Sequence, residues 1–272
     1  MKRKIVQGLE RLIRSMGFEV ETYRIPKKQD NSDALNLNIG AGTYVIPGFE
    51  SLDIYTHHYY KSKEAFLKER VEYDIRSDDI PYADASVDNI YINHVIEHIE
   101  TEHIERFFAE AFRVLKTGAV LRSGCPDAAF LYQVSRFENE YWTWRKPWFR
   151  KSMQDGNDTV SQFDAMMGML ATQRLAGGKN SVPDLQVSED DVDADDYTAL
   201  AKLLRSDTHF RPEFPGDHIN NWDFDRIYKM GTSAGFRHII QSKPKGSLSA
   251  AMQNQRFDRN HNHMSLYVDL LK

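Results

Sequence analysis

The stretch "LNLNIGAGTYVIPGFESLDI", residues 35–54, holds two short apolar runs on either side of a glycine-containing loop. Gly40 and Gly42 let the backbone turn sharply and approach a ligand closely, because neither has a Cβ atom. A dinucleotide-binding fingerprint would continue to a third glycine at the start of a helix, but Val45 stands in the loop instead. The connection to Glu50 is also too short for an ordinary crossover helix. We therefore predict two strands joined by a ligand-binding loop, without a pyrophosphate on a helix N-terminus.

Further apolar runs of strand length follow along the chain. We expect strands over 34–40, 49–55, 70–75, 87–95, 118–126, 237–243 and 263–272. Residues 101–118 carry a helical apolar stripe, and Gly118 stands where a C-cap belongs. A second helix is expected over 222–236. A strand, a helix and a further strand in succession favour a parallel sheet.

The pattern changes in the middle of the chain, where an insertion is expected instead of another sheet repeat. It holds Trp142, Trp144, Trp148, a methionine-rich segment 163–178 expected to be a helix ending in glycine, and an acidic run 188–196 expected to be solvated. The tryptophans could stack on an acceptor, but packing of a small subdomain is favoured. We divide the chain into an N-terminal amphipathic helix and connector (1–33), a core (34–130), an insertion covering the acceptor (131–217) and the C-terminal part of the core sheet (218–272).

Composition bounds the class of protein. With 272 residues, of which 41% are hydrophobic, the chain can bury one large core. Its net charge of -5 argues against nucleic acid as the partner. The single cysteine, Cys125, excludes an internal disulfide framework and suits a reducing, cytoplasmic compartment. No apolar run approaches the roughly 20 residues that span a bilayer.

Two carboxylates follow the glycine loop at the ends of the next two predicted strands. Asp53 closes "SLDI", where a carboxylate can accept hydrogen bonds from both hydroxyls of a ribose. Asp74 closes "VEYDI", where it can accept from the exocyclic amine of adenine. Ligands of open α/β sheets bind outside the carboxyl ends of the strands. The loop and the two acids together predict a nucleoside site at this edge.

In this order, the motifs resemble the class I S-adenosylmethionine-dependent methyltransferases, in particular small bacterial members of the methyltransferase type 11 kind. The resemblance rests on residues 35–54, on "YDIRSDDIPYADASVDNIYINHVIEHI" (73–99), on "EAFRVLKTGAVLRSGCPD" (110–127) and on "AGF" (234–236). It implies a Rossmann-like α/β fold with a seven-stranded, mostly parallel sheet, an antiparallel last strand and a helical insertion. It also implies S-adenosylmethionine as the cofactor.

The same resemblance assigns residues to the parts of the cofactor. Gly40 and Gly42 would pass under the methionine part, Asp53 would hold the ribose, and Asp74 and Ile75 would hold the adenine. Asn93 would lie beside the cofactor after the fourth strand. The remaining residues expected to border the cofactor are Ala41, Ile54 and His94.

His94, Glu97 and His98 spell H-x-x-E-H, a spacing found in zinc peptidases. On a helix the two histidines would lie one turn apart and could share a metal. In the resembling family, however, a glutamate and a histidine follow the fourth strand as part of the fold. A zinc site would also need a third ligand on a supporting element, so we assign no metal ligand and expect His98 to be packed or hydrogen-bonded.

The chemistry expected is methyl transfer to a small molecule or a glycan precursor, at an oxygen. Removal of the hydroxyl proton calls for a general base, for which His218, in "FPGDHINNW", and Asp127, in "GCPD", are the candidates. Bacterial polysaccharide biosynthesis is the setting that family analogy favours. A homodimer is left open. The alternatives are a metal-dependent hydrolase using the H-x-x-E-H residues and a cofactor-binding protein without transferase activity.

Overall fold

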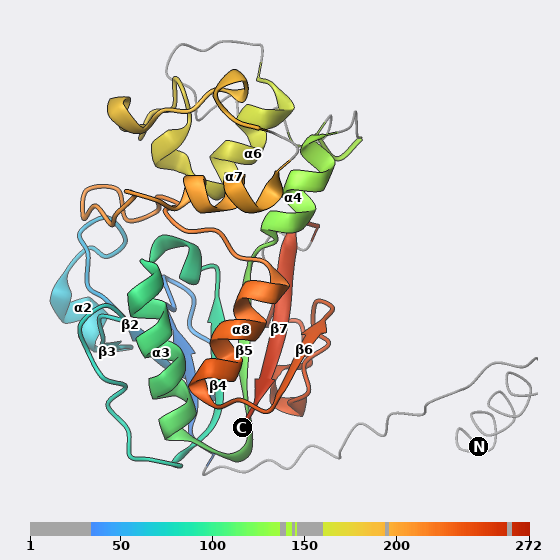
Figure 1. The fold of residues 1–272 in the computed structure, drawn as a ribbon. Coiled ribbons are helices and arrows are strands. Elements are labelled where there is room, and N and C mark those ends of the chain that lie inside the picture. Colours follow the sequence, from blue (N-terminus) through green and yellow to red (C-terminus); the bar gives the residue numbers. More distant parts are fainter. Residues whose placement is uncertain (1–33, 137–139, 143–144, 146–159, 194–195, 260–262) are drawn as a thin grey trace, which may run out of the picture. The chain divides into compact units, whose positions relative to one another are not determined.

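The computed structural model describes residues 34–136, 140–142, 145, 160–193, 196–259 and 263–272 (Figure 1). The predicted N-terminal helix and connector lie outside the described residues, as do Trp144 and Trp148. Among the described helices, none combines the length and the apolar character that crossing a bilayer requires.

A seven-stranded sheet with the order β3-β2-β1-β4-β5-β7-β6 forms the centre of residues 34–272 (Figure 1). Its strands are β1 (Asn36–Ile39), β2 (Glu50–Asp53), β3 (Val71–Glu72), β4 (Val87–Asn93), β5 (Leu115–Pro126), β6 (His238–Ser242) and β7 (Ser265–Leu271). The first five pair in parallel, and β7 runs antiparallel to both β5 and β6. The predicted Rossmann-like sheet with an antiparallel last strand is therefore confirmed.

One face of the sheet packs against two amphipathic helices, α3 (Thr101–Val114) and α8 (Phe224–Ala234), which lie side by side in Figure 1. Alternate strand residues point to this face, because successive side chains of a strand alternate. The core joins side chains such as Leu37 and Ile90 from the strands with Phe108 and Ile227 from the helices. These two helices cover this face of the sheet.

The start of β5 differs from the sequence prediction. Helix α3 ends at Val114 and the chain is extended from Leu115, so Gly118 lies inside β5 and is not a helix C-cap. Backbone amides of a neighbouring loop bind the last carbonyls of the helix, including that of Val114 from Ser86 at 2.8 Å. A glycine cap is not needed when such donors are present. Gly118, with φ +80°, instead donates its N–H to the carbonyl of Lys272.

The helices of the middle region have their own apolar cluster. Helices α4 (Ala128–Ser135), α6 (Gln162–Leu170) and α7 (Tyr197–Leu204) pack around Trp142, which is fully buried and donates its ring N–H to Val134. Trp142 therefore packs, as favoured from the sequence. The methionine-rich helix ends at Leu170, earlier than predicted, and continues as the 3-10 turn η3 (Thr172–Arg174). The boundaries of the predicted insertion stay predictions.

The acidic run of this region has little regular structure. It contains the 3-10 turn η5 (Glu189–Asp191), and Asp196 caps α7. The other short elements are α2 (Lys63–Leu67) and the 3-10 turns η1 (Ile96–His98), η4 (Pro183–Leu185) and η6 (Ala250–Met252).

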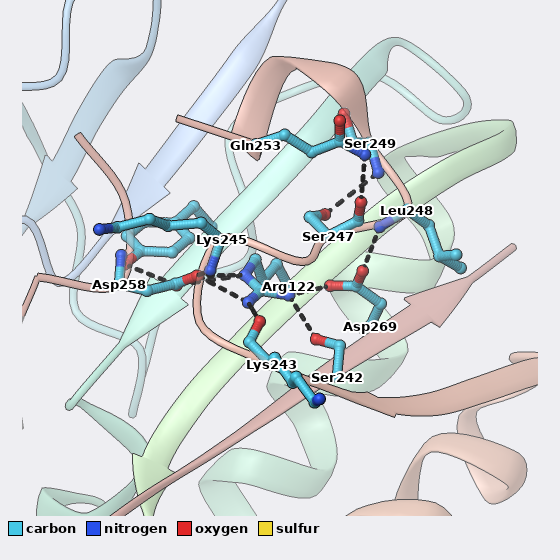
Figure 2. Close-up of polar contacts among 11 residues, drawn as sticks. Arg122, Ser242, Lys243, Lys245, Ser247, Leu248, Ser249, Gln253, Asp258 and Asp269 are labelled. Carbon is cyan, nitrogen blue, oxygen red and sulfur yellow. Dashed lines mark hydrogen bonds and ion pairs between the residues drawn. The ribbon is translucent and has the colours of Figure 1, made fainter. Parts of the chain in front are cut away.

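The other face of the sheet carries a buried ion network around Arg122 of β5 (Figure 2). Its guanidinium binds Asp258 at 2.6 Å and Asp269 at 2.8 Å, and none of the three side chains is exposed. Arg122 also donates to the hydroxyl of Ser242 and to the carbonyl of Lys243. The network thereby attaches the segment between β6 and β7 to the sheet.

Candidate active site

A cleft of about 390 Å³ lies at the carboxyl ends of β1, β2, β3 and β4, a size typical of ligand sites. All nine residues predicted to contact the cofactor line it: Gly40, Ala41, Gly42, Asp53, Ile54, Asp74, Ile75, Asn93 and His94. The structure therefore brings together residues from four strand ends and the loops that follow them. Further lining residues that the sequence did not indicate include Tyr44, Tyr59, Tyr73, Arg76, His98 and Phe210.

The glycine loop forms one wall of the cleft. Gly40 and Gly42 have φ values of +63° and +55°, in the region that side chains disfavour. A Cβ atom on Gly40 would come within 2.4 Å of the Val95 side chain. Gly40 is therefore required for two reasons. Its backbone conformation disfavours a side chain, and the loop passes too close to Val95, after β4, to leave room for one.

Asp53, the last residue of β2, points its carboxylate at the glycine loop. Oδ2 accepts from the N–H of Gly42 at 2.7 Å and from the hydroxyl of Tyr60 at 2.6 Å, and Oδ1 accepts from the N–H of Ile54 at 2.8 Å. A carboxylate has about four acceptor positions, so one remains, on Oδ1. Burial raises the pKa of Asp53, although the hydrogen bond from Tyr60 opposes the rise. Asp53 can thus accept from one ribose hydroxyl without any rearrangement.

Asp74 lies two residues beyond β3 and is held by Arg76. The guanidinium binds both carboxylate oxygens at 3.0 Å and packs 3.5 Å from the centre of the Phe210 ring. Burial alone would raise the pKa of Asp74, but the hydrogen bonds from Arg76 lower it overall. Phe210 follows α7, and its N–H donates to Glu100 at 2.7 Å. The segment after α7 therefore reaches the adenine end of the predicted site.

Three cleft-lining residues have a buried side-chain oxygen without a hydrogen-bond partner in the described part of the chain: Thr56, Tyr73 and Asn93. Leaving a buried polar atom unpaired costs about 1–3 kcal/mol, so such atoms indicate where a ligand binds. The amide oxygen of Asn93 can accept from an amino group, and the two hydroxyls can donate or accept. Together with Asp53, these groups fit a nucleoside that carries an amino-acid tail.

The H-x-x-E-H residues do not share one helical face. β4 ends at Asn93, His94 has φ +55°, and the following turn η1 is a 3-10 helix of three residues. Nδ1 of His94 lies 3.0 Å from Oε1 of Glu97, and Nε2 lies 2.9 Å from the hydroxyl of Ser265. With both ring nitrogens engaged, His94 cannot join His98 on a metal. The ligand set of the hydrolase alternative is therefore not formed.

A different group forms instead, which we call the Glu97–His98–His218 cluster. One ring nitrogen of each histidine and one carboxylate oxygen of Glu97 lie within 4.8 Å of one another. The two rings meet edge to face, with centres 4.8 Å apart. Backbone N–H groups of Ile219 and Asn220 donate to the carbonyl of Glu97 at 2.9 and 3.0 Å, which fixes His218 against η1.

Charge in the cluster is set by burial and by the neighbouring rings. Burial would raise the pKa of Glu97, but the hydrogen bond from His94 and the nearby imidazoles lower it to about 2. Burial and the adjacent His98 lower the pKa of His218 to about 4. At neutral pH the cluster therefore combines an ionised carboxylate with a neutral imidazole of His218.

The two catalytic candidates lie away from the lining of the cleft. His218 reaches it only through His98, which does line it. The carboxylate of Asp127 caps α4 by accepting from the N–H of Phe130 at 3.1 Å. The catalytic role of Asp127 stays a prediction.

Known proteins point to the same class of enzyme. Residues 49–122 match the family model described as a methyltransferase domain, and this span contains Asp53, Asp74 and the chain through β4. This match, together with the sheet order and the cleft, identifies the protein as a class I methyltransferase. Its cofactor is S-adenosylmethionine, as the resemblance of the sequence implies.

Several solved structures are similar in fold. A SAM-dependent methyltransferase from Thermotoga maritima, described as a possible histamine N-methyltransferase, is 12% identical, with 99% of this chain and 97% of that chain covered and a TM-score of 0.42. A protein from Pyrococcus horikoshii is 13% identical, with coverages of 99% and 90% and a TM-score of 0.44. A putative O-methyltransferase from Nostoc punctiforme is 10% identical, with a TM-score of 0.40; 89% of this chain aligns with 53% of that longer one. No curated protein matches the chain.

Proposed function

We propose that the protein methylates a hydroxyl oxygen of a small acceptor. The observation that carries this proposal is the contact between the cofactor cleft and the Glu97–His98–His218 cluster, since His98 belongs to both. A hydroxyl acceptor must lose its proton during methyl transfer, and groups that assist this loss contribute roughly 10²–10⁴-fold. Together with His94, the cluster places ionisable side chains at the β4 end of the cleft.

The chain's own residues hold and orient the cofactor. In this proposal the glycine loop supports the methionine part, Asp53 binds the ribose, Asp74 and Ile75 bind the adenine, and Asn93 accepts from the amino group. When bound, S-adenosylmethionine supplies an electrophilic methyl group on its sulfonium. Holding the two reactants in line can supply much of the rate enhancement, because an oriented pair reacts as one molecule.

The proposed methyl transfer is a simple displacement. The acceptor oxygen forms the new C–O bond, the C–S bond breaks with its electron pair left on sulfur, and the hydroxyl proton leaves to water. His218, the base predicted from the sequence, does not line the cleft. In this proposal it therefore does not take the proton directly and acts only through its ring contact with His98. Asp127 is left out of this step, because its carboxylate serves as a helix cap.

A carbohydrate precursor is the acceptor class that we favour. The rings of Tyr44 and Tyr59 line the cleft and are 38% and 45% exposed, so they offer apolar faces to an incoming ring. Phe210 and Pro215, from the end of the predicted insertion, line the same cleft, which supports an acceptor-covering role for that region. The link to polysaccharide biosynthesis rests on family resemblance alone.

The test is methyl transfer from S-adenosylmethionine carrying an isotopic label on its methyl group. The protein is incubated with separate panels of sugars and nucleotide sugars, phenols, and amines, and products are identified by mass spectrometry. We expect a labelled methyl ether from a hydroxylated acceptor, and about 10–100-fold less product from Asp53→Ala at a limiting cofactor concentration. Labelled N-methyl products alone would overturn the oxygen assignment. Tight binding of S-adenosylhomocysteine without turnover on any panel would favour the cofactor-binding protein without transferase activity.

A further inference from the structure

We infer that Glu97, His98 and His218 form a binding site for one divalent transition-metal ion of the zinc class. Two imidazoles and one carboxylate are a ligand set that such ions take, with bonds of about 2.0–2.2 Å. The three ligand atoms already lie within 4.8 Å of one another. The sequence indicated a different set of metal ligands, with His94 in place of His218. It could not show that His218 lies near Glu97, because this depends on a contact between distant segments of the chain.

Both histidines are oriented as metal ligands commonly are. Nδ1 of His98 lies 2.8 Å from the carbonyl oxygen of Asp217, and Nδ1 of His218 contacts the carbonyl oxygen of Met169. A carbonyl can only accept, so each Nδ1 carries a hydrogen and Nε2 is the ring nitrogen left to bind a metal. Metal-binding histidines usually donate their other ring N–H to such a carbonyl or carboxylate, which fixes the tautomer and orientation.

The buried carboxylate of Glu97 also points to a bound cation. Glu97 is 1% exposed, and its Oε2 has no hydrogen-bond partner among the described residues. Its Oε1 accepts from His94 and lies 4.0 Å from Nε2 of His98. A buried carboxylate oxygen without a donor is unfavourable, and a ring nitrogen of each histidine lies within 4.8 Å of a carboxylate oxygen of Glu97. A bound cation would satisfy all three groups.

The geometry needs only a small closure. Around a tetrahedral ion with bonds of about 2.1 Å, ligand atoms lie roughly 3.4 Å apart. The present spacings of up to 4.8 Å would therefore shorten by as much as about 1.4 Å. Rotation of the side chains can supply this change. The hydrogen bond from His94 would hold Glu97 in place, in the manner of the outer partners of metal ligands.

A three-ligand site leaves at least one coordination position open, as catalytic zinc sites do. Because His98 lines the cleft, this position can face an acceptor there. A coordinated hydroxyl loses its proton more readily, since such ions lower the pKa of a bound oxygen. This role rests on the proposed function, whereas metal binding itself does not.

The test is metal content and affinity of the full-length, untagged protein after chelation and dialysis. We expect about one Zn²⁺ per chain, little binding of Mg²⁺, and visible absorption bands when Co²⁺ is bound. His98→Ala and His218→Ala should each weaken Zn²⁺ binding by about 100-fold or more. Removing a residue that only hydrogen-bonds to a metal ligand already weakens binding about 10–100-fold. His209→Ala is the matched control, because His209 is exposed and lies, like His218, between α7 and α8. This variant should bind Zn²⁺ as the wild type does.

Titration with S-adenosylhomocysteine separates this inference from the proposed function. Stoichiometric S-adenosylhomocysteine binding by a wild-type protein that takes up no Zn²⁺ would overturn the metal site and leave the methyltransferase. Zn²⁺ binding that persists in both histidine variants would also overturn the site. Zn²⁺ binding in the absence of any S-adenosylhomocysteine binding would keep the metal site and overturn the proposed function.

Discussion

The hydroxyl of Tyr60 lies 2.6 Å from Oδ2 of Asp53, on one of the two oxygens that a ribose would use. The same hydroxyl lies 2.7 Å from the carbonyl oxygen of Gly42. One hydroxyl proton cannot serve both acceptors at once. Tyr60 can therefore donate to Gly42 and release Asp53 when a second ribose hydroxyl arrives.

We expect Asp53→Ala to weaken binding of S-adenosylhomocysteine by about 10–100-fold, since a hydrogen bond to a charged group contributes about 1.5–3 kcal/mol. Tyr60→Phe is the matched control. It keeps the ring and frees Oδ2, so its affinity should stay within a few-fold of the wild type. Isothermal titration of both variants gives the two affinities. Equal binding by Asp53→Ala and the wild type would exclude Asp53 as the ribose ligand.

The affinity for S-adenosylhomocysteine should depend on pH through Asp53. Burial raises its pKa above the ordinary value of 3.8, against the opposing effects of Tyr60 and Arg70. Since the ionised carboxylate is the better acceptor of ribose hydrogen bonds, affinity should be constant at neutral pH. It should then fall as the pH drops through this raised pKa, by up to about tenfold per unit.

Titrations at several pH values between neutral and the acid limit of folding measure this dependence. Asp74 does not confuse the result, because its pKa is lowered and it titrates further into acid. Circular dichroism at each pH shows whether the protein stays folded. An Asp53→Asn variant with the same pH profile as the wild type would contradict the assignment.

Gly40→Ala should destabilise the protein and disrupt the cleft. The left-handed backbone costs a side chain about 1–2 kcal/mol, and the overlap with Val95 about 1–3 kcal/mol more. Gly48→Ala is the control, because it has φ +84° but no heavy atom within 4 Å of the added Cβ. Urea unfolding should show the larger loss for Gly40→Ala, with partial recovery in Gly40→Ala/Val95→Ala. Equal losses for the two glycines would contradict the close passage over Val95.

Arg122→Met should cost about 3–5 kcal/mol of unfolding free energy, because it leaves two buried carboxylates, Asp258 and Asp269, without their cation. Lys116→Met provides the comparison. Lys116 pairs with Asp88 at a similar distance, but the two side chains are 45% and 28% exposed, so the loss should be below about 1 kcal/mol. Urea or thermal unfolding measures both. Similar losses would show that burial does not govern the Arg122 network.

The positions of the strands and the lining of the cleft were predictable because their signals are local, whereas the seven-stranded sheet with its antiparallel last strand was implied by the family resemblance. Alternating apolar residues mark each strand, and parallel strands place their carboxyl ends at one edge. Asp53 and Asp74 therefore had to lie close to the glycine loop. Helix ends were less predictable: α3 stops at Val114 because a loop binds its carbonyls, and no residue within the helix signals this.

The sequence by itself determined the strands and the cofactor edge, since period, glycine placement and strand-end carboxylates are encoded within short segments, and the resemblance of its motifs implied the methyltransferase sheet. Only the tertiary structure decided the other end of the cleft. There the guanidinium of Arg76 packs on the ring of Phe210, and backbone N–H groups beside His218 donate to the carbonyl of Glu97, although these segments are more than a hundred residues apart. The physical reason is that such contacts follow from how loops cross the sheet edge, which depends on the packing of the whole core.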